Sequence, residues 1–207
     1  MIAIIDYGVG NLFSLSRSLS AIGAKAVITG DAKEVRRADK LILPGVGAFG
    51  DAVQKLRTTG LDQVILEEAA RGKPILGICL GMQLLFEKSQ EYGTHTGLGL
   101  IPGSVVPMEG VIPQALKIPH IGWNALRLRK SSPLLRHTKE GDFVYFVHSY
   151  YASGCDDYVI ADTQYGAWLT AAVQNKNVFG CQFHPEKSGP VGLNILRAFA
   201  EMEESQC

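Results

Sequence analysis

The chain has 207 residues, of which 46% are hydrophobic, and its 20 Lys and Arg residues balance 20 Asp and Glu residues. A chain of this size can bury one sizeable core, so we expect a single domain over residues 1–207. The balanced charge gives no electrostatic footprint for nucleic acid or an anionic membrane, and neither is expected as a partner. No apolar run approaches the roughly 20 residues that cross a bilayer, and no basic leader precedes the first apolar run, which predicts a soluble, cytoplasmic protein.

The four cysteines, at positions 79, 155, 181 and 207, show neither the close pairing of a disulfide framework nor the spacing of a metal site. This pattern is typical of reduced thiols in the cytoplasm. We therefore expect no metal, and nothing in the chain implies an organic cofactor.

Short apolar runs alternate with helical patterns through the first part of the chain. We expect strands at residues 2–5, 26–28 and 41–43 and a helix at residues 12–22. This alternation predicts a parallel sheet covered by helices on both faces. Gly8 and Gly10 follow the first strand, as in a dinucleotide-binding turn, but the third glycine of that motif is absent. We therefore interpret this loop as a strand end near the active edge of the sheet.

Three glycines, Gly45, Gly47 and Gly50, follow the third expected strand. They leave backbone N–H groups accessible at the carboxyl end of a strand. One of these groups, paired with the N–H of Leu80, would form an oxyanion hole, in which a donor is worth about 3 kcal/mol. The alternative is a phosphate-binding loop or a plain turn, although no Gly-Lys-Ser/Thr follows to make a Walker motif. A helix is expected next, at residues 61–71.

Cys79 lies where an expected strand is followed by an expected helix. The spacing of apolar residues predicts that this helix ends near Lys88. The spacing Gly77-x-Cys79-x-Gly81 copies the Gly-x-Ser-x-Gly nucleophile elbow, with sulfur in place of oxygen. A tight turn exposes the nucleophile, and the start of a helix offers N–H groups and a positive dipole end that favour a thiolate and an oxyanion. The alternative is a small buried cysteine without chemistry, and a nearby base is needed to decide.

Glycines and prolines crowd residues 94–129, whose short alternating runs predict a small antiparallel insertion. An aromatic strand is expected at residues 142–147, two more strands between residues 158 and 174, and another at residues 178–183. The last helix is expected at residues 191–202. An acidic tail, residues 201–204, is expected to fray because the helix dipole disfavours negative charge at that end.

His184 supplies the base that Cys79 requires. It follows the strand at residues 178–183, so we expect it at the same carboxyl edge of the sheet as Cys79. Glu186, two residues on, would hold one imidazole nitrogen and leave the other facing the thiol. These residues outline a Cys-His-Glu triad. The alternatives are that His184 merely ends a strand, or that His148 is the base; only His184 has a carboxylate two residues on.

The two runs Gly77–Gln83 and His184–Glu186 resemble the motifs of the triad-type, or class I, glutamine amidotransferases. The resemblance implies a flavodoxin-like α/β fold with an open, mainly parallel sheet. It implies an enzyme whose cysteine attacks the side-chain amide of glutamine, releases ammonia and forms a thioester that water hydrolyses. The catalytic residues would be Cys79, His184 and Glu186. The substrate pocket would be lined by Gln83, Glu91, His148, Ser149 and Tyr150. The oxyanion donors would come from Gly45, Val46, Gly47 and Leu80.

Two further runs, Pro44–Phe49 and Pro119–Asn124, are similar to those of one branch of this family, the glutaminase subunits of imidazole glycerol phosphate synthase. The resemblance covers nearly the whole chain and implies no cofactor. It implies a heterodimer with a (β/α)8 cyclase, which uses the ammonia to make imidazole glycerol phosphate and aminoimidazole carboxamide ribotide in histidine biosynthesis. No segment of this chain looks able to use the ammonia itself. The interface with the cyclase is expected to include Pro119, His120, Trp123, Asn124 and Lys187.

Free hydrolysis would waste glutamine, so we expect the cyclase with its ligand to activate a subunit that is nearly silent alone. A glycine in Gly45–Gly47 would let one peptide flip its N–H into or out of the oxyanion hole. Three alternatives remain open. The first is a glutaminase subunit of another synthase, although the run Pro119–Asn124 argues against it. The others are a cysteine hydrolase or peptidase of similar fold, and a non-catalytic flavodoxin-like binding module in which Cys79 is inert.

Overall fold

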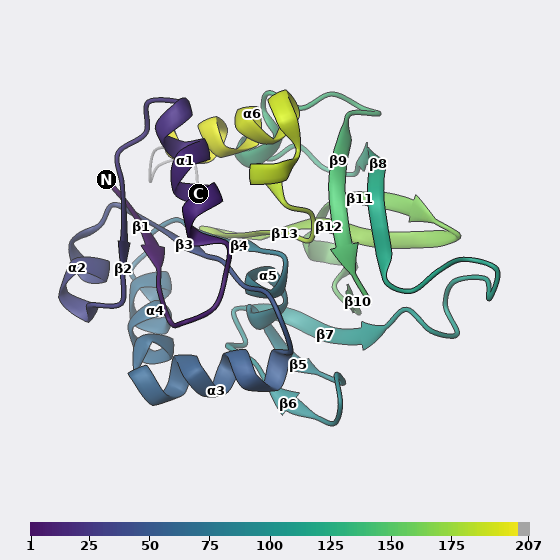
Figure 1. Ribbon diagram of the computed structural model, residues 1–207, viewed down its shortest axis with the longest axis horizontal. Coiled ribbons are helices and arrows are strands. Elements are labelled where there is room, and N and C mark those ends of the chain that lie inside the picture. Colours follow the sequence, from purple (N-terminus) through teal and green to yellow (C-terminus); the bar gives the residue numbers. More distant parts are fainter. Residues whose placement is uncertain (203–207) are drawn as a thin grey trace.

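Residues 1–202 are described in the computed structural model, which contains two β-sheets (Figure 1). Five neighbouring strands of the larger sheet run parallel, in the order β2 (Ala26–Thr29), β1 (Ile2–Ile5), β3 (Lys40–Leu43), β4 (Ile75–Ile78) and β13 (Val178–Cys181). The sheet continues with antiparallel strands, in the order β12 (Ala167–Asn175), β11 (Val159–Tyr165), β8 (His120–Leu128) and β9 (Phe143–His148). The predicted α/β fold class is confirmed, and the change from parallel to antiparallel pairing occurs beside β13.

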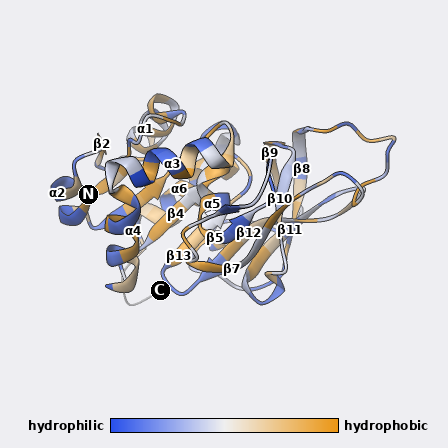
Figure 2. Cartoon of the chain, turned by 90° about the horizontal axis from the view of Figure 1, so that it is seen from below, coloured by the Kyte–Doolittle hydropathy of each residue, from blue (hydrophilic) through white to orange (hydrophobic). Residues whose placement is uncertain are grey.

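Helices cover both faces of the parallel strands, which explains why those strands are apolar throughout. Along β1, Ile2 and Ile4 belong to the core under α1 (Leu12–Ala21) and α6 (Gly189–Ala200). Ala3 and Ile5 belong to the core under α2 (Ala32–Arg37), α3 (Phe49–Thr59) and α4 (Leu61–Ala70). In Figure 2 the central strands β4 and β13 are hydrophobic, whereas surface helices such as α3 carry hydrophilic residues as well.

A second, smaller sheet has the order β10 (Tyr150–Ser153), β7 (Ile101–Pro107), β5 (Phe86–Ser89) and β6 (His95–Thr96). The predicted helix from the elbow to Lys88 is wrong, because α5 (Leu80–Leu84) ends after five residues and the chain enters β5. The carbonyl oxygens of Leu84 and Leu85 accept hydrogen bonds from residues 98, 100 and 101 instead of from a further helical turn. This early end of α5 brings residues 89–96 beside α3.

The segment 94–129 contains short strands, as predicted, but they are divided between the two sheets. β6 pairs antiparallel with β5, β7 pairs parallel with β5, and β8 joins the large sheet. Helices α2 and α3 were not predicted, and α3 follows directly on the glycine loop after β3. Short 3-10 helices occur at η1 (Pro133–Leu135), η2 (Asp156–Tyr158) and η3 (Pro185–Lys187).

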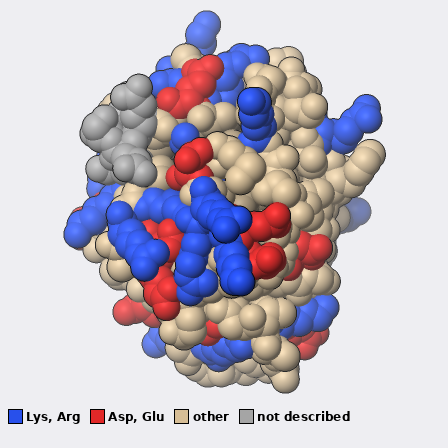
Figure 3. All heavy atoms as spheres, turned by 90° about the vertical axis from the view of Figure 1, so that its left-hand side faces the viewer, with Lys and Arg blue, Asp and Glu red and all other residues tan. Residues whose placement is uncertain are grey.

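Charged side chains of both signs are interspersed on the face drawn in Figure 3. The acidic tail predicted to fray begins at Glu201, which the structure holds in an ion pair with Arg136. Its later residues, Glu203 and Glu204, lie outside the described residues, as does Cys207. Within residues 1–202, no helix is long and apolar enough to span a membrane.

Candidate active site

Cys79 occupies a tight turn between β4 and α5, in which the two flanking positions have no room for a side chain. Its backbone has φ 54° and ψ −110°, a conformation that residues other than glycine rarely adopt. A Cβ atom added at Gly81 would lie 1.8 Å from the carbonyl oxygen of Leu43, and one added at Gly77 would lie 2.7 Å from the carbonyl oxygen of Gly81. Both glycines of the Gly-x-Cys-x-Gly spacing are therefore required by close approach of backbone. The turn is tied to β13, because the Cys79 N–H donates to the Cys181 carbonyl at 2.8 Å.

His184 and Glu186 form a buried pair in the turn that follows β13. His184 Nδ1 lies 2.8 Å from Glu186 Oε1, and each side chain is only 3% exposed. The backbone around them is fixed, because the His184 N–H donates to the Tyr145 carbonyl at 2.9 Å and the Ser188 hydroxyl donates to the His184 carbonyl at 2.6 Å. The turn thus places an oriented imidazole beside Cys79.

The charge state of His184 follows from its neighbours. Burial by itself lowers the pKa of an imidazole, but the Cys79 sulfur and the Glu186 carboxylate outweigh it and raise the pKa of His184 to about 9. The imidazole therefore carries two protons at neutral pH. With Nδ1 bound to Glu186, the nitrogen left for the substrate is Nε2, which is buried and has no hydrogen-bond partner within residues 1–202.

His148, the alternative base, is held in a different state. Its Nδ1 donates to the Tyr150 carbonyl at 2.9 Å, and its Nε2 lies 3.1 Å from Nδ1 of His120. The pKa of His148 is lowered to about 4, mainly by burial and to a smaller extent by His120 and His184, while the Tyr150 carbonyl opposes this shift. A neutral imidazole with both nitrogens occupied is poorly suited to accept a substrate proton, so the geometry favours His184 as the base.

A chain of buried amides connects Cys79 to the substrate side of the site. Gln182 Nε2 lies 3.7 Å from the Cys79 sulfur, and Gln182 Oε1 accepts from Gln83 Nε2 at 3.0 Å. The same Gln83 nitrogen also lies 3.1 Å from the Tyr150 carbonyl. Gln83 is therefore connected to Cys79 through Gln182, a residue that sequence reasoning missed. Its only sequence signal was its position two residues before His184.

The glycine loop after β3 is held at its start and lies against the elbow. The Tyr7 hydroxyl donates to the Pro44 carbonyl at 2.8 Å. At Gly45, an added Cβ would lie 2.9 Å from the backbone nitrogen of Gly81 and from Cβ of Leu80. The predicted oxyanion residues Gly45 and Leu80 are thus neighbours. Tyr7 was missed by sequence reasoning, because a tyrosine at the end of β1 gives no sign of where its hydroxyl bonds.

The middle of this loop is free of backbone bonds. Gly45, Val46 and Gly47 make no backbone hydrogen bond with any residue of the described chain. Gly47 has φ 96°, and Val46 is 45% exposed. A peptide with no hydrogen bond to break, next to a glycine in a left-handed conformation, has a low barrier to reorientation.

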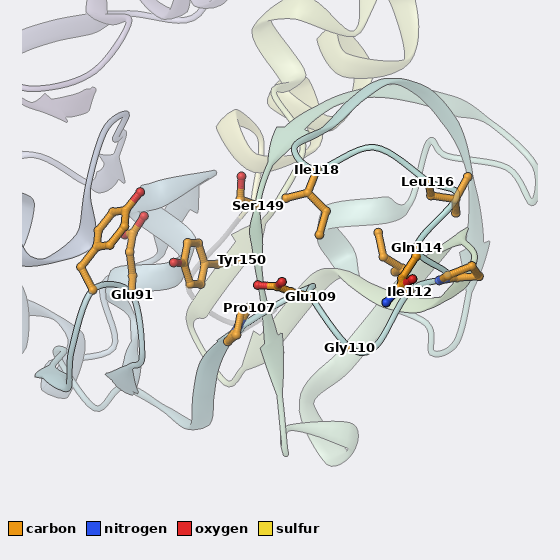
Figure 4. A pocket seen from close by; sticks show the side chains of 12 residues that line it. Glu91, Pro107, Glu109, Gly110, Ile112, Gln114, Leu116, Ile118, Ser149 and Tyr150 are labelled. Carbon is orange, nitrogen blue, oxygen red and sulfur yellow. The ribbon is translucent and has the colours of Figure 1, made fainter.

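A cavity of about 610 Å³ opens beside the site (Figure 4). Glu91, Ser149 and Tyr150 line one end, so the structure gathers three of the predicted substrate residues. Figure 4 shows Glu109 between this polar end and an end lined by Ile112, Gln114 and Leu116. His148 contributes from beneath, since its ring holds the Tyr150 carbonyl. Glu91 lies in the turn between β5 and β6, facing the cavity.

The predicted interface residues differ in exposure. Trp123 is 51% exposed and forms an edge contact with Tyr145 at 6.0 Å between ring centroids. Lys187 is exposed, with Nζ 6.0 Å from the centre of the same Tyr145 ring, and Pro119 is exposed as well.

His120, in contrast, is fully buried. Its ring stacks on Phe146 and Tyr165 at 5.0 and 4.0 Å, and its Nε2 lies 2.8 Å from Asn124 Oδ1. His120 and Asn124 therefore pack behind the exposed residues of β8. The His120 side chain itself is not accessible to a partner. Among residues 1–202, no cluster of three or more His, Cys, Asp or Glu side chains is arranged to hold a metal ion.

Comparisons with known proteins agree with this geometry. The family model for glutamine amidotransferase class-I matches residues 3–202. Solved structures with the same fold include "Structure of PurLQS from Thermotoga maritima", with a TM-score of 0.74 and 22% identity over 96% of each chain.

Curated relatives are much closer in sequence. Imidazole glycerol phosphate synthase subunit HisH of Caldanaerobacter subterraneus subsp. tengcongensis is 53% identical over 98% of each chain. The subunit of the same name from Bacillus subtilis is 48% identical over 100% of this chain and 98% of its own length. The chain therefore belongs to the class-I glutamine amidotransferase family and, within it, to the HisH subunits of imidazole glycerol phosphate synthase.

Proposed function

We propose that this chain hydrolyses L-glutamine to L-glutamate and ammonia at Cys79 and passes the ammonia to a separate cyclase subunit. The observation that carries the proposal is the imidazole of His184, which is bound to Glu186 at 2.8 Å and held beside a cysteine in a strained, glycine-flanked turn. Nucleophile, base and orienting carboxylate are the three parts of a catalytic triad.

In the first half of the reaction, Cys79 attacks the side-chain carbonyl carbon of glutamine as a thiolate, because its proton has already passed to His184. The oxyanion that forms would be stabilised by the N–H of Leu80 and by an N–H from the Gly45–Gly47 loop. His184 carries two protons at neutral pH, so its Nε2 donates one to the amide nitrogen. The C–N bond then breaks, ammonia leaves, and a thioester remains on Cys79.

In the second half, His184 is neutral and acts as a base. Its Nε2 takes a proton from water, and the resulting hydroxide attacks the thioester carbon. The C–S bond breaks and glutamate leaves. The proton taken from water stays on His184, which returns the Cys79–His184 pair to its starting state. Glu186 keeps Nδ1 protonated throughout, so Nε2 always faces the substrate.

The cavity beside the site suits the amino-acid end of glutamine. In the proposed complex the Glu91 carboxylate binds the α-ammonium group, and Ser149 and Tyr150 line the same end. Gln83 holds the Tyr150 carbonyl and Gln182 in place. The wall beneath the substrate is therefore built from buried amides that are hydrogen-bonded to one another, which favours one fixed geometry.

The ammonia would go to a (β/α)8 cyclase that makes imidazole glycerol phosphate and aminoimidazole carboxamide ribotide. Support comes from relatives that cover the whole chain and are named as subunits of that synthase. The proposed docking face contains Pro119, Trp123 and Lys187, over His120 and Asn124. It includes exposed aromatic surface of the kind enriched at interface hot spots. We place the reaction in the cytoplasm, where Cys79, Cys155 and Cys181, which form no disulfide, would stay reduced.

The test is glutamate release from glutamine by this chain alone, with the cyclase, and with the cyclase plus its ribonucleotide ligand. We expect a large rate increase only in the last mixture, and loss of at least about 10⁴-fold in Cys79→Ala. Equal rates in the free chain and in the loaded complex would contradict activation by the partner. No glutamate release in any mixture would contradict the proposed chemistry.

A further inference from the structure

The Glu91 side chain takes part in two features of the structure. Oε2 accepts a hydrogen bond from the Phe49 N–H at 2.6 Å, while the side chain also lines the substrate cavity. Phe49 is the first residue of α3, and its N-cap residue, Ala48, has no side chain able to cap the helix. Glu91 therefore serves as the helix cap from another segment of the chain. A carboxylate at this end is also favoured by the helix dipole.

The start of α3 is seated on the β5–β6 turn by more than this bond. The buried Phe49 ring lies 6.4 Å from the His95 ring, and a Cβ added at Gly50 would lie 2.8 Å from His95 Cε1. In the last turn of α3, Arg57 Nη2 donates to the Thr96 carbonyl at 2.9 Å. The turn that carries Glu91 and the helix that follows the glycine loop thus form one packed unit.

The glycine loop is consequently fastened at both ends and free between them. Tyr7 holds Pro44 at the start, Glu91 holds Phe49 at the end, and Gly45–Gly47 have no backbone bond to any residue in 1–202. The residue that would bind the α-ammonium group of glutamine is therefore also the residue that fixes where the proposed oxyanion loop ends.

We propose that Glu91 is a positioning residue for the oxyanion loop as well as a contact for the substrate. Through Oε2 it sets the position of α3, and through α3 the position of the Gly45–Gly47 N–H groups over Cys79. This inference rests on the proposed function and extends it: binding of the substrate amino group and stabilisation of the oxyanion share one carboxylate.

Two substitutions separate the two roles. Glu91→Gln removes the negative charge that attracts an ammonium group but keeps a carbonyl oxygen for the Phe49 N–H, whereas Glu91→Ala removes both. Glutaramate, which is glutamine without its α-amino group, reports the loop alone, because it has no ammonium group to bind. The matched control is Glu87→Gln. It alters an exposed carboxylate on β5, the strand before the turn that carries Glu91, and this carboxylate accepts from the Gly103 N–H at 3.0 Å.

With glutamine, in the complex with cyclase and ligand, Glu91→Gln is expected to raise KM at least about tenfold while kcat stays within about threefold. With glutaramate, the rate of ammonia release is expected to fall less in Glu91→Gln than in Glu91→Ala, and to be unchanged in Glu87→Gln. The same rate is expected to fall about tenfold in Glu91→Ala, because the loop donors are misplaced.

A second readout does not depend on catalysis. Hydrogen exchange of the peptide covering residues 44–52 in the full chain is expected to speed up in Glu91→Ala and to stay near wild type in Glu91→Gln. Equal exchange and equal glutaramate rates in the two Glu91 variants would overturn the positioning role. If the wild-type complex releases no ammonia from either compound, the proposed function fails, and the exchange experiment still decides whether Glu91 holds the loop.

Discussion

Two buried histidines, each at the end of a strand of the large sheet, are driven to opposite charge states. His184, in the turn after β13, faces Glu186 and Cys79, and its pKa is raised to about 9. His148, at the end of β9, faces the Tyr150 carbonyl and another histidine, His120, and its pKa is lowered to about 4. Both rings are buried, so burial does not distinguish them.

The difference lies in the partners of the two rings. The Cys79 sulfur and the Glu186 carboxylate outweigh the lost solvation of the His184 imidazolium, whereas the Tyr150 carbonyl does not outweigh it at His148. Charge in turn separates the roles: the charged ring is able to give a proton to a leaving amide nitrogen, and the neutral ring serves as a fixed donor and acceptor. In the proposed mechanism His184 performs the acid and base steps, while His148 holds the Tyr150 carbonyl in the pocket wall.

The largest expected effect comes from Glu186→Gln. This variant removes the carboxylate charge beside His184, which is one of the two groups that raise the pKa of that imidazole. We expect kcat to fall about 10³-fold, because the imidazole loses its orienting charge and its pKa falls. Charged His184 stabilises the fold fully below its ordinary pKa near 6.5, and this contribution is lost as pH rises through about 9. The Tm difference between variant and wild type should thus be greatest near pH 6 and shrink toward pH 10.

The control for this variant is Glu201→Gln, which removes a carboxylate from an exposed ion pair with Arg136. It should leave kcat unchanged and shift Tm by a degree or two at most. A Glu186→Gln enzyme with wild-type kcat would show that orientation of His184 does not need the carboxylate.

The second prediction concerns the neutral histidine. His148 has a pKa of about 4 in the folded chain and near 6.5 when unfolded, so stability is lost as pH falls from 6.5 to 4. His148→Asn keeps a donor for the Tyr150 carbonyl and removes this titration. We expect the variant to be less stable than wild type at pH 7, with a difference that narrows by about 2–3 kcal/mol toward pH 4. Urea unfolding at the two pH values measures it, and a difference independent of pH would contradict a neutral His148.

The smallest expected effect concerns the strand that joins the two regions. Tyr145 on β9 accepts from the His184 N–H, and Trp123 on β8 pairs with Tyr145. Trp123→Ala should weaken binding of the cyclase about tenfold to thirtyfold, as expected for one aromatic hot spot, with Tm nearly unchanged.

Titration calorimetry with the purified cyclase measures the binding change. Ile28→Ala is a suitable control, because Ile28 is 40% exposed on β2, at the opposite edge of the sheet from β9. Equal affinities for the two variants would remove Trp123 from the proposed docking face.

Much of the parallel half of the fold was predictable from sequence, because the spacing of apolar residues and the composition of that region fit only one assignment of strands and helices. The strands at residues 2–5, 26–28 and 41–43 and the helices at residues 12–22 and 61–71 occur within one or two residues of their expected bounds. The short α5 was not predictable, since apolar spacing through Phe86 suits a helix equally well. What ends α5 is a set of hydrogen bonds from residues 98–101, which are distant in sequence.

The candidate site divides in the same way. Cys79, His184 and Glu186 were accessible because short motifs position them relative to strand ends. Gln182 and Tyr7 were not, because their importance comes from single long-range bonds, to the Cys79 sulfur and to the Pro44 carbonyl. The second use of Glu91 also depends on α3, a helix that sequence spacing did not predict.

The backbone of Cys79 has a consequence for how this position tolerates mutation. At φ 54° and ψ −110° a cysteine is strained by about 1–3 kcal/mol, and glycine is not. Cys79→Gly should therefore yield a chain that still folds, because relief of the strain offsets the loss of the buried side chain, and that catalyses nothing. A screen that rewards thermal stability or soluble yield would not remove that variant. Only a screen for ammonia release would keep the cysteine, so libraries built on this protein must be sorted by turnover and not by folding.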